Sequence, residues 1–198
     1  MYKTCKGLTY AKYASGGDGS AVVYSGGKVK EKLTVKVDIN PQYAEGQDHA
    51  DGIRVAHCKK MTGIDTAFEL ADLPADIRKD WLGWETSTND LLITDQEPGF
   101  IGVGFYIWNE DPTDNDDQWI CYWIYKSKFT ADSISVSTAT DSIAYQHQSV
   151  SGSGVGVQLA SSGPMVFAIT NDSPLATEAA AIAWLKTQAG ITYLISCI

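Results

Sequence analysis

The chain has 198 residues, a formal net charge of −9, 44% hydrophobic residues and 20% charged residues. This length gives room for one domain with a full core, so we expect a single domain over residues 1–198. The acidic balance argues against ordinary nucleic-acid binding, which depends on clustered Lys and Arg. No run approaches the ~18 apolar residues of a membrane helix, and we expect no export signal.

The cysteines show no metal-type spacing. All four lie in or beside apolar or strand-like segments, which is typical of reduced thiols in a protein made in the cytoplasm. A disulfide framework is not expected at this chain length and spacing. The four are Cys5, Cys58, Cys121 and Cys197.

Short strands broken by glycine turns are predicted for residues 1–32. Apolar and polar residues alternate along 33–39 and again along 64–71, which predicts strands that each bury one face. Strands are expected at 8–13, 21–24, 33–39, 55–61 and 64–71, and turns at 15–19 and 25–27.

Residues 40–52 form a polar, acidic segment that contains Pro and Gly and is too long for a tight turn. Two hypotheses remain open: a solvent loop, or an interaction arm that becomes ordered against a neighbouring subunit. Tyr43 is its only large apolar side chain and would be the anchor of such an arm. The candidate interface residues are Tyr43, Ala44, Glu45, Gly46, Asp48 and Asp51.

Two helices are predicted. In residues 73–83, Pro74 suits the first helical position and Gly83 suits the residue just past the end, while Ile77, Trp81 and Leu82 would be buried. The second helix is expected at about 178–189. Thr177 would cap this helix, Gly190 would end it, and Trp184 would anchor it on a sheet.

Residues 100–129 predict a long antiparallel hairpin, rich in β-branched and aromatic residues. Both faces of this hairpin are apolar. A further sheet, a helix or another subunit must therefore cover the second face.

The turn of this hairpin is acidic: it carries Glu110, Asp111, Asp114, Asp116 and Asp117. Carboxylates are hard oxygen ligands, so calcium is an alternative for this turn. The central Gly and trailing Glu of an EF-hand are missing, however, and no helices flank the segment. A solvated acidic tip is the favoured interpretation, and we expect no metal and no cofactor.

Beyond residue 129 the chain predicts more short β segments, at 143–147, 155–159 and 165–169, separated by turn-rich stretches at 151–154 and 161–164. The predicted fold class is mainly β: a β-sandwich or barrel with flanking α-helices.

Catalytic groupings are not evident in the sequence. His57 beside Cys58 would be a fragment of a metal site or a thiol dyad, but adjacent strand residues face opposite sides. His49 and His147 stand apart from them. Hydrolase, metalloprotease and phosphate-loop motifs are lacking, and the glycines at 152–156 are not followed by a helix. We expect a protein that is not an enzyme and has no catalytic residues.

Five segments in order resemble the major tail proteins, or tail tube proteins, of long-tailed non-contractile bacteriophages. The first is a strand that runs into Pro41-Gln-Tyr-Ala-Glu-Gly, and the second is a strand followed by a short helix that ends Trp81-Leu-Gly. The third, fourth and fifth are Pro98-Gly-Phe-Ile-Gly-Val-Gly-Phe-Tyr, Tyr122-Trp-Ile-Tyr-Lys-Ser-Lys-Phe and the helix from Thr177 to Ile191. The acidic turn and the tail after Ile191 depart from the family pattern.

This resemblance implies a tail-tube fold and a structural role in the virion. Such proteins assemble in the host cytoplasm into stacked hexameric rings, which form a tube through which DNA leaves the capsid. The implied partners are further copies of the chain, a tape measure protein, a tail terminator and distal tail proteins. DNA would pass through the lumen without specific binding, and no membrane would be involved. By the same resemblance, neighbouring subunits would cover the apolar hairpin faces.

An alternative is a β-sandwich module on a virion or cell surface that binds a carbohydrate or receptor through exposed Trp and Tyr rings.

Overall fold

The computed structural model describes residues 2–50, 53–87, 90–93, 97–110, 117–131, 146–159, 164–170 and 175–191, and its fold is mainly β, as predicted. The strands in chain order are β1 (Tyr2–Ser15), β2 (Val23–Lys30), β3 (Thr34–Ala50), β4 (Ile53–Leu70), β5 (Glu85–Thr86), β6 (Leu91–Leu92), β7 (Ile101–Glu110), β8 (Asp117–Ala131), β9 (Gln148–Val155), β10 (Val157–Gln158), β11 (Pro164–Met165) and β12 (Phe167–Ile169). The helices are α1 (Ala75–Leu82) and α2 (Glu178–Gln188).

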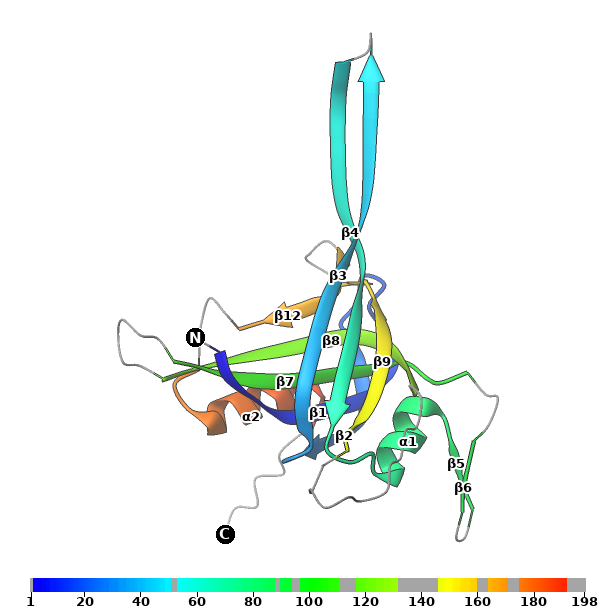
Figure 1. Cartoon of the computed structure of the whole chain (residues 1–198), viewed down its shortest axis with the longest axis vertical. Coiled ribbons are helices and arrows are strands. Elements are labelled where there is room, and N and C mark those ends of the chain that lie inside the picture. Colours follow the sequence, from blue (N-terminus) through cyan, green and yellow to red (C-terminus); the bar gives the residue numbers. More distant parts are fainter. Residues whose placement is uncertain are drawn as a thin grey trace, which may run out of the picture.

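One antiparallel sheet organises the molecule. Its strand order is β2-β1-β7-β8-β9-β4-β3, and β12 pairs separately with β8. The sheet folds back on itself, so that β3, β4 and β9 cross over β1, β7 and β8 (Figure 1). The main core fills the space between these two layers. Its largest fully buried side chains come from several strands and from α1, and include Tyr10, Phe68, Trp81, Ile124 and Phe129.

The alternation along residues 64–71 is confirmed. Ile64, Thr66, Phe68 and Leu70 are each at most 2% exposed, and the residues between them are more exposed. Phe68 packs edge-on against the Trp81 ring, with ring centroids 5.5 Å apart. Burial on alternate positions therefore directs β4 against α1 and the main core.

The long hairpin is confirmed as β7 and β8, but its second face is covered within the chain. Ile101, Val103 and Phe105 face the main core, whereas Tyr106 and Trp123 belong to a second cluster under α2. Trp123 is 0% exposed there. The implication that neighbouring subunits cover both hairpin faces is therefore wrong, because α2 already seals the second one.

The caps of α2 are those predicted. Thr177 Oγ1 accepts a hydrogen bond from the Ala180 backbone N–H at 3.2 Å, and Gly190 ends the helix with a φ of 66°. The docking differs from the prediction: Ala181 and Leu185 are fully buried, whereas Trp184, the expected anchor, packs against this cluster only partly buried.

The short helix α1 is confirmed as well. Pro74 is its N-cap rather than its first helical residue, and Gly83 follows it with a φ of 71°. Asp80 is 7% exposed, which the sequence did not predict, and its Oδ1 lies 2.7 Å from Lys12 Nζ. Burial alone would raise the pKa of Asp80, but hydrogen bonds from Lys12 and Lys28 outweigh it and lower the pKa.

The turn predicted at residues 25–27 is wrong, because these residues lie within β2. The pairing between β1 and β2 slips between Tyr10 and Lys12, and Gly26 sits at the slip with a φ of 61°. The glycines therefore allow a bulge inside a strand.

The turn predicted at residues 151–154 is also wrong. These residues lie in β9, between β4 and β8. A Cβ atom on Gly152 would lie 2.5 Å from the Phe129 ring, and one on Gly154 would lie 2.5 Å from Ile64. Glycine is required here by close packing rather than by a turn.

The remaining short β segments are confirmed only in part. Met165 ends β11 and Phe167 begins β12, with the buried Val166 between them. Residues 143–145 and 192–198 lie outside the described residues. No helix in the described part of the chain is long and apolar enough to cross a membrane.

Candidate interaction surfaces

Residues 40–50 do not form a loop. They belong to β3, and their pairing with β4 continues far beyond the body of the protein (Figure 1). The last pair that β4 makes with β9 is Gly63 with Val155. Beyond it, the described residues of β3 and β4 pair only with each other. We call residues 43–50 and 53–61 of this projection the ribbon.

The ribbon presents four of the six predicted interface residues to solvent. Tyr43 is 50% exposed, and Ala44, Glu45 and Gly46 are exposed beside it. Lys59, on the opposite strand, lies 2.8 Å from Glu45 Oε1 and 4.8 Å from the centroid of the Tyr43 ring. The hydrogen bond to Glu45 raises the pKa of Lys59. Asp48 pairs with Ala56 through the backbone, and Asp51 lies outside the described residues.

The acidic turn is described only at its two ends. Glu110 and Asp117 are cross-strand partners where β7 ends and β8 begins. Asp111, Asp114 and Asp116 lie outside the described residues, so the calcium alternative stays untested. Within the described part of the chain, no group of His, Cys, Asp and Glu has the arrangement of a metal site.

The candidate thiol and imidazole groups are scattered. Cys58 and His57 are both exposed on the ribbon, opposite Gly46 and Gln47. His147 Nδ1 lies 2.8 Å from Glu69 Oε1, on another part of the sheet. Cys5, Cys58 and Cys121 are free thiols, in line with the prediction of reduced cysteines. Burial raises the pKa of both the Cys5 and Cys121 thiols to about 12, which disfavours a nucleophilic thiolate at these two positions.

The outer side of the β3-β4-β9-β8 layer is a polar surface, which we call the polar face. Its cross-strand rows join Asn40, Asp65, Ser153 and Lys128 in one line, and Asp38, Ala67, Ser151 and Thr130 in the next. Flanking rows contain Gln42 with Gly63 and Val155, and Lys36 with Glu69 and Ser149.

Charges on the polar face are largely compensated. Lys36 Nζ lies 2.6 Å from Asp38 Oδ2, and Lys128 forms an ion pair with Glu97. Asp65 accepts a hydrogen bond from the Gln42 side chain at 2.5 Å. Of the five charged residues in these rows, three are acidic, so the face offers no cluster of free cations to a polyanion.

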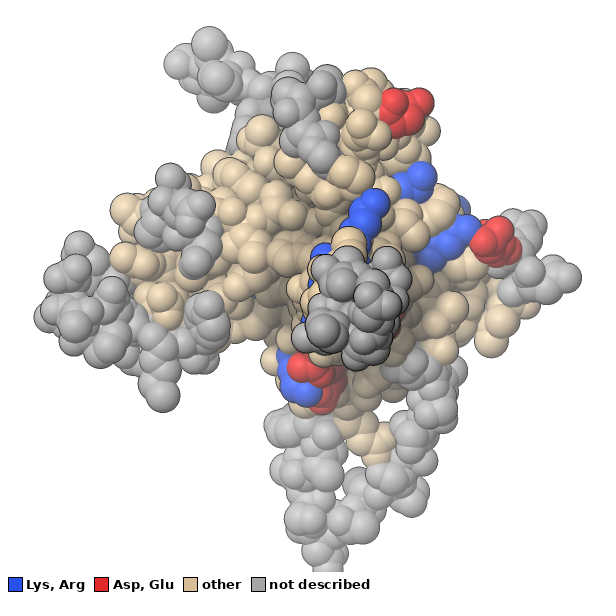
Figure 2. Space-filling view, turned by 90° about the horizontal axis from the view of Figure 1, so that it is seen from above, with Lys and Arg blue, Asp and Glu red and all other residues tan. Residues whose placement is uncertain are grey.

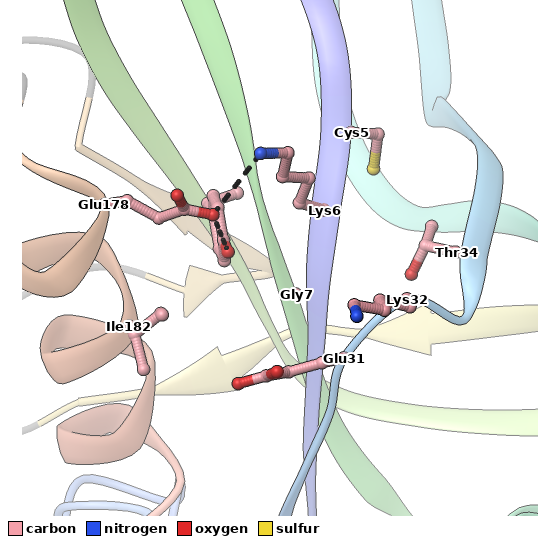
Figure 3. A pocket seen from close by; sticks show the side chains of 9 residues that line it. Cys5, Lys6, Gly7, Glu31, Lys32, Thr34, Glu178 and Ile182 are labelled. Atoms are coloured by element: carbon pink, nitrogen blue, oxygen red, sulfur yellow. Dashed lines mark hydrogen bonds and ion pairs between the residues drawn. The ribbon is translucent and has the colours of Figure 1, made fainter.

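A mixed pocket of about 510 Å³ lies between β1, the start of β3 and α2 (Figure 3). Glu178 reaches into it from α2. Its Oε1 accepts a hydrogen bond from Tyr106 Oη at 2.7 Å and lies 3.5 Å from Lys6 Nζ. These contacts hold the start of α2 against β1 and β7. The described lining of the pocket combines both charge signs: Lys6 and Lys32 with Glu31 and Glu178.

A second hollow, of about 540 Å³, opens between β3 on one layer and β1, β7, β8 and β12 on the other. We call it the apolar groove. None of its lining residues is charged, and Phe105 and Tyr122 stack within it at a centroid distance of 5.1 Å. Its lining comprises Thr4, Cys5, Val37, Ile39, Phe105, Ile107, Tyr122, Phe167 and Ile169.

Sequence reasoning missed both the polar face and the apolar groove. A signal for the polar face was present in β9, where serines at 149, 151 and 153 alternate with Val150 and glycines. The sequence carries no such pattern for the apolar groove, because its lining residues come from five strands that only the folding of the sheet brings together.

Comparison with models of known protein families finds no match, and comparison with curated proteins finds no similar sequence.

Proposed function

We propose that this chain is a structural protein that assembles with copies of itself into stacked hexameric rings, forming the tail tube of a non-contractile phage. The resemblance of five segments motivates the proposal. In this role the tube conducts DNA toward the host. The partners inside the tube and at its ends are a tape measure protein, a tail terminator and distal tail proteins.

The observation that carries the proposal is the ribbon. An isolated two-stranded ribbon is marginally stable in water, because it lacks a hydrophobic face packed on a core. All described side chains at positions 43–47 and 57–60 are exposed. Its two free strand edges are also open to further pairing. A ribbon that projects this far gains its stability by contact with another molecule, and a neighbouring ring of the same chain supplies a repeated partner.

The polar face supports the proposed conduit. A wall along which DNA slides must present hydrogen-bonding groups and little net positive charge, because each free Lys or Arg would retain a phosphate. The polar face has this composition, and its lysines are already paired with carboxylates. We therefore assign the polar face to the lumen of the tube.

The alternative role in carbohydrate or receptor binding has no comparable support. Tyr43 is the only aromatic side chain that is exposed among the described residues, and the described tryptophans are buried or partly buried. A platform of exposed rings, which this role would use, is not present in that part of the chain.

Negative-stain electron microscopy of the purified chain tests the proposal. We expect rings with six-fold symmetry, or tubes built from them. A chain that stays monomeric over the full range of attainable concentrations, with and without added salt or crowding agents, would overturn it.

A further inference from the structure

One small projection of the described chain exposes two large aliphatic side chains beside polar residues. The β5-β6 hairpin leaves the body next to α1 (Figure 1). At the base of the hairpin, where β6 ends opposite Glu85, Leu92 is 48% exposed and the following Ile93 is 71% exposed, and Ile93 is the most exposed large apolar side chain among the described residues. Exposing two adjacent large aliphatic residues on a projecting element costs solubility unless another surface covers them.

The apolar groove is the matching hollow. Its lining carries no charged residue, and Ile169 at its border is 41% exposed. Around it, the described surface on the β12 side of the ribbon is free of charged side chains when the molecule is seen from above (Figure 2). A volume of about 540 Å³ is large enough for two aliphatic side chains.

The two features lie on opposite sides of the molecule. β12 is at the left of the view in Figure 1, and β5 and β6 are at the lower right. Leu92 and Ile93 therefore cannot enter the groove of their own chain. A contact between different patches of identical chains is heterologous, and such a contact repeats from copy to copy until a ring closes.

We propose that Leu92 and Ile93 of one copy pack into the apolar groove of the next copy within a ring. This inference rests on the proposed function, because it names the side-to-side contact of that assembly. The ribbon then serves a different contact, between rings. Two separate contacts account for the two projections of one chain.

A cross-linking experiment tests the contact directly. Cys5, Cys58 and Cys197 are first replaced by Ala, Ser and Ser, which leaves Cys121, buried under α2, as the remaining native thiol. The test variant then carries Ile93→Cys with Ile169→Cys. Its matched control carries Ile93→Cys with Val155→Cys, because Val155 is 42% exposed, close to the 41% of Ile169, but lies on the polar face. Assembled samples are treated with a short bismaleimide, which alkylates one thiol at each end.

For the variant with Ile93→Cys and Ile169→Cys, the expected result is a series of cross-linked species up to the hexamer. For the variant with Ile93→Cys and Val155→Cys, no species above the dimer is expected. In parallel, Ile93→Asp in the native background should raise the concentration needed for assembly by at least tenfold, because the contact loses a buried aliphatic side chain. Its thermal midpoint should not change, since Ile93 is 71% exposed in the single chain.

The failures of the two proposals can be told apart. If the native chain forms rings, but neither of these two variants gives the series of cross-linked species and Ile93→Asp assembles like the native chain, the groove contact is wrong and the proposed function stands. If the native chain never assembles, both are wrong.

Discussion

Asp80 Oδ2 on α1 lies 2.7 Å from Lys28 Nζ on β2, although the two residues are 52 positions apart in the chain. The same oxygen accepts a hydrogen bond from Tyr10 Oη on β1 at 3.2 Å. A single buried carboxylate therefore fixes α1 to two strands. The side chain of Asp80 is 5% exposed, whereas that of Lys28 is 40% exposed, so only one partner bears a large desolvation cost.

Asp80→Asn should lower the free energy of unfolding by about 1–3 kcal/mol, which is less than for a fully buried pair because the lysines stay in contact with water. Asp38→Asn is the matched control: it breaks the exposed pair between Asp38 and Lys36 and should lower the free energy of unfolding clearly less than Asp80→Asn does. Urea unfolding of both variants checks this. Equal losses in the two variants would show that the Asp80 network contributes no more than a surface ion pair.

The stability difference between the native chain and Asp80→Asn should depend on pH. The pKa of Asp80 is lowered in the folded chain, because the two lysines outweigh the effect of burial. Its contribution is therefore fully present above the unfolded-state pKa of about 3.9 and is lost as pH falls through the lower folded-state pKa. Unfolding measured from pH 7 down to pH 2 should show the difference shrinking only below about pH 4. A difference that shrinks between pH 7 and pH 5 would contradict this assignment.

Two glycines in strands should differ in how strongly the same substitution affects stability. Gly152→Ala places a Cβ 2.5 Å from the Phe129 ring and should destabilise the fold by about 1–3 kcal/mol. Gly46→Ala, on the ribbon, meets no atom within 4 Å and should change stability by at most about 0.5 kcal/mol. Thermal unfolding of both variants measures the contrast, and a neutral Gly152→Ala would mean that β9 is not packed between β4 and β8 in this way.

Much of the fold is encoded in local patterns. The alternation at Ile64 to Leu70 and the caps Thr177 and Gly190 each depend on neighbours in the sequence, and these predictions are confirmed. The errors occur where neighbours in space decide. Gly152 and Gly154 suggest a turn by type, yet they lie in a central strand because bulky partners on β8 and β4 leave no room for a side chain.

The ribbon was missed for a related reason. Pro41 and Gly46 disfavour strands, so residues 40–52 resembled a loop. β3 is the last strand of the sheet, and a proline is tolerated on such an edge because one side of the strand has no partner. The composition of residues 40–52 identified them as candidates for an interface. Their position on a paired, projecting element follows from the register of β3 with β4.

Shortening the ribbon should separate folding from assembly. Tyr43 and Met61 are direct partners, so replacing residues 44–60 by Asn-Gly gives a two-residue hairpin turn at the body. Pairing of β4 with β9 ends at Gly63 and remains intact. We expect a folded chain whose thermal midpoint lies within a few degrees of the native one and which forms single rings but no tubes. Tubes of normal length from this variant would show that the ribbon does not join rings.

Sedimentation velocity of the purified native chain over a wide concentration range, with microscopy of the same samples, tests self-assembly most directly. The account predicts a species with six times the 21.4 kDa mass of one chain, which grows into tubes as concentration rises. A single species of 21.4 kDa at every concentration, with the ribbon resistant to protease in that state, would contradict it.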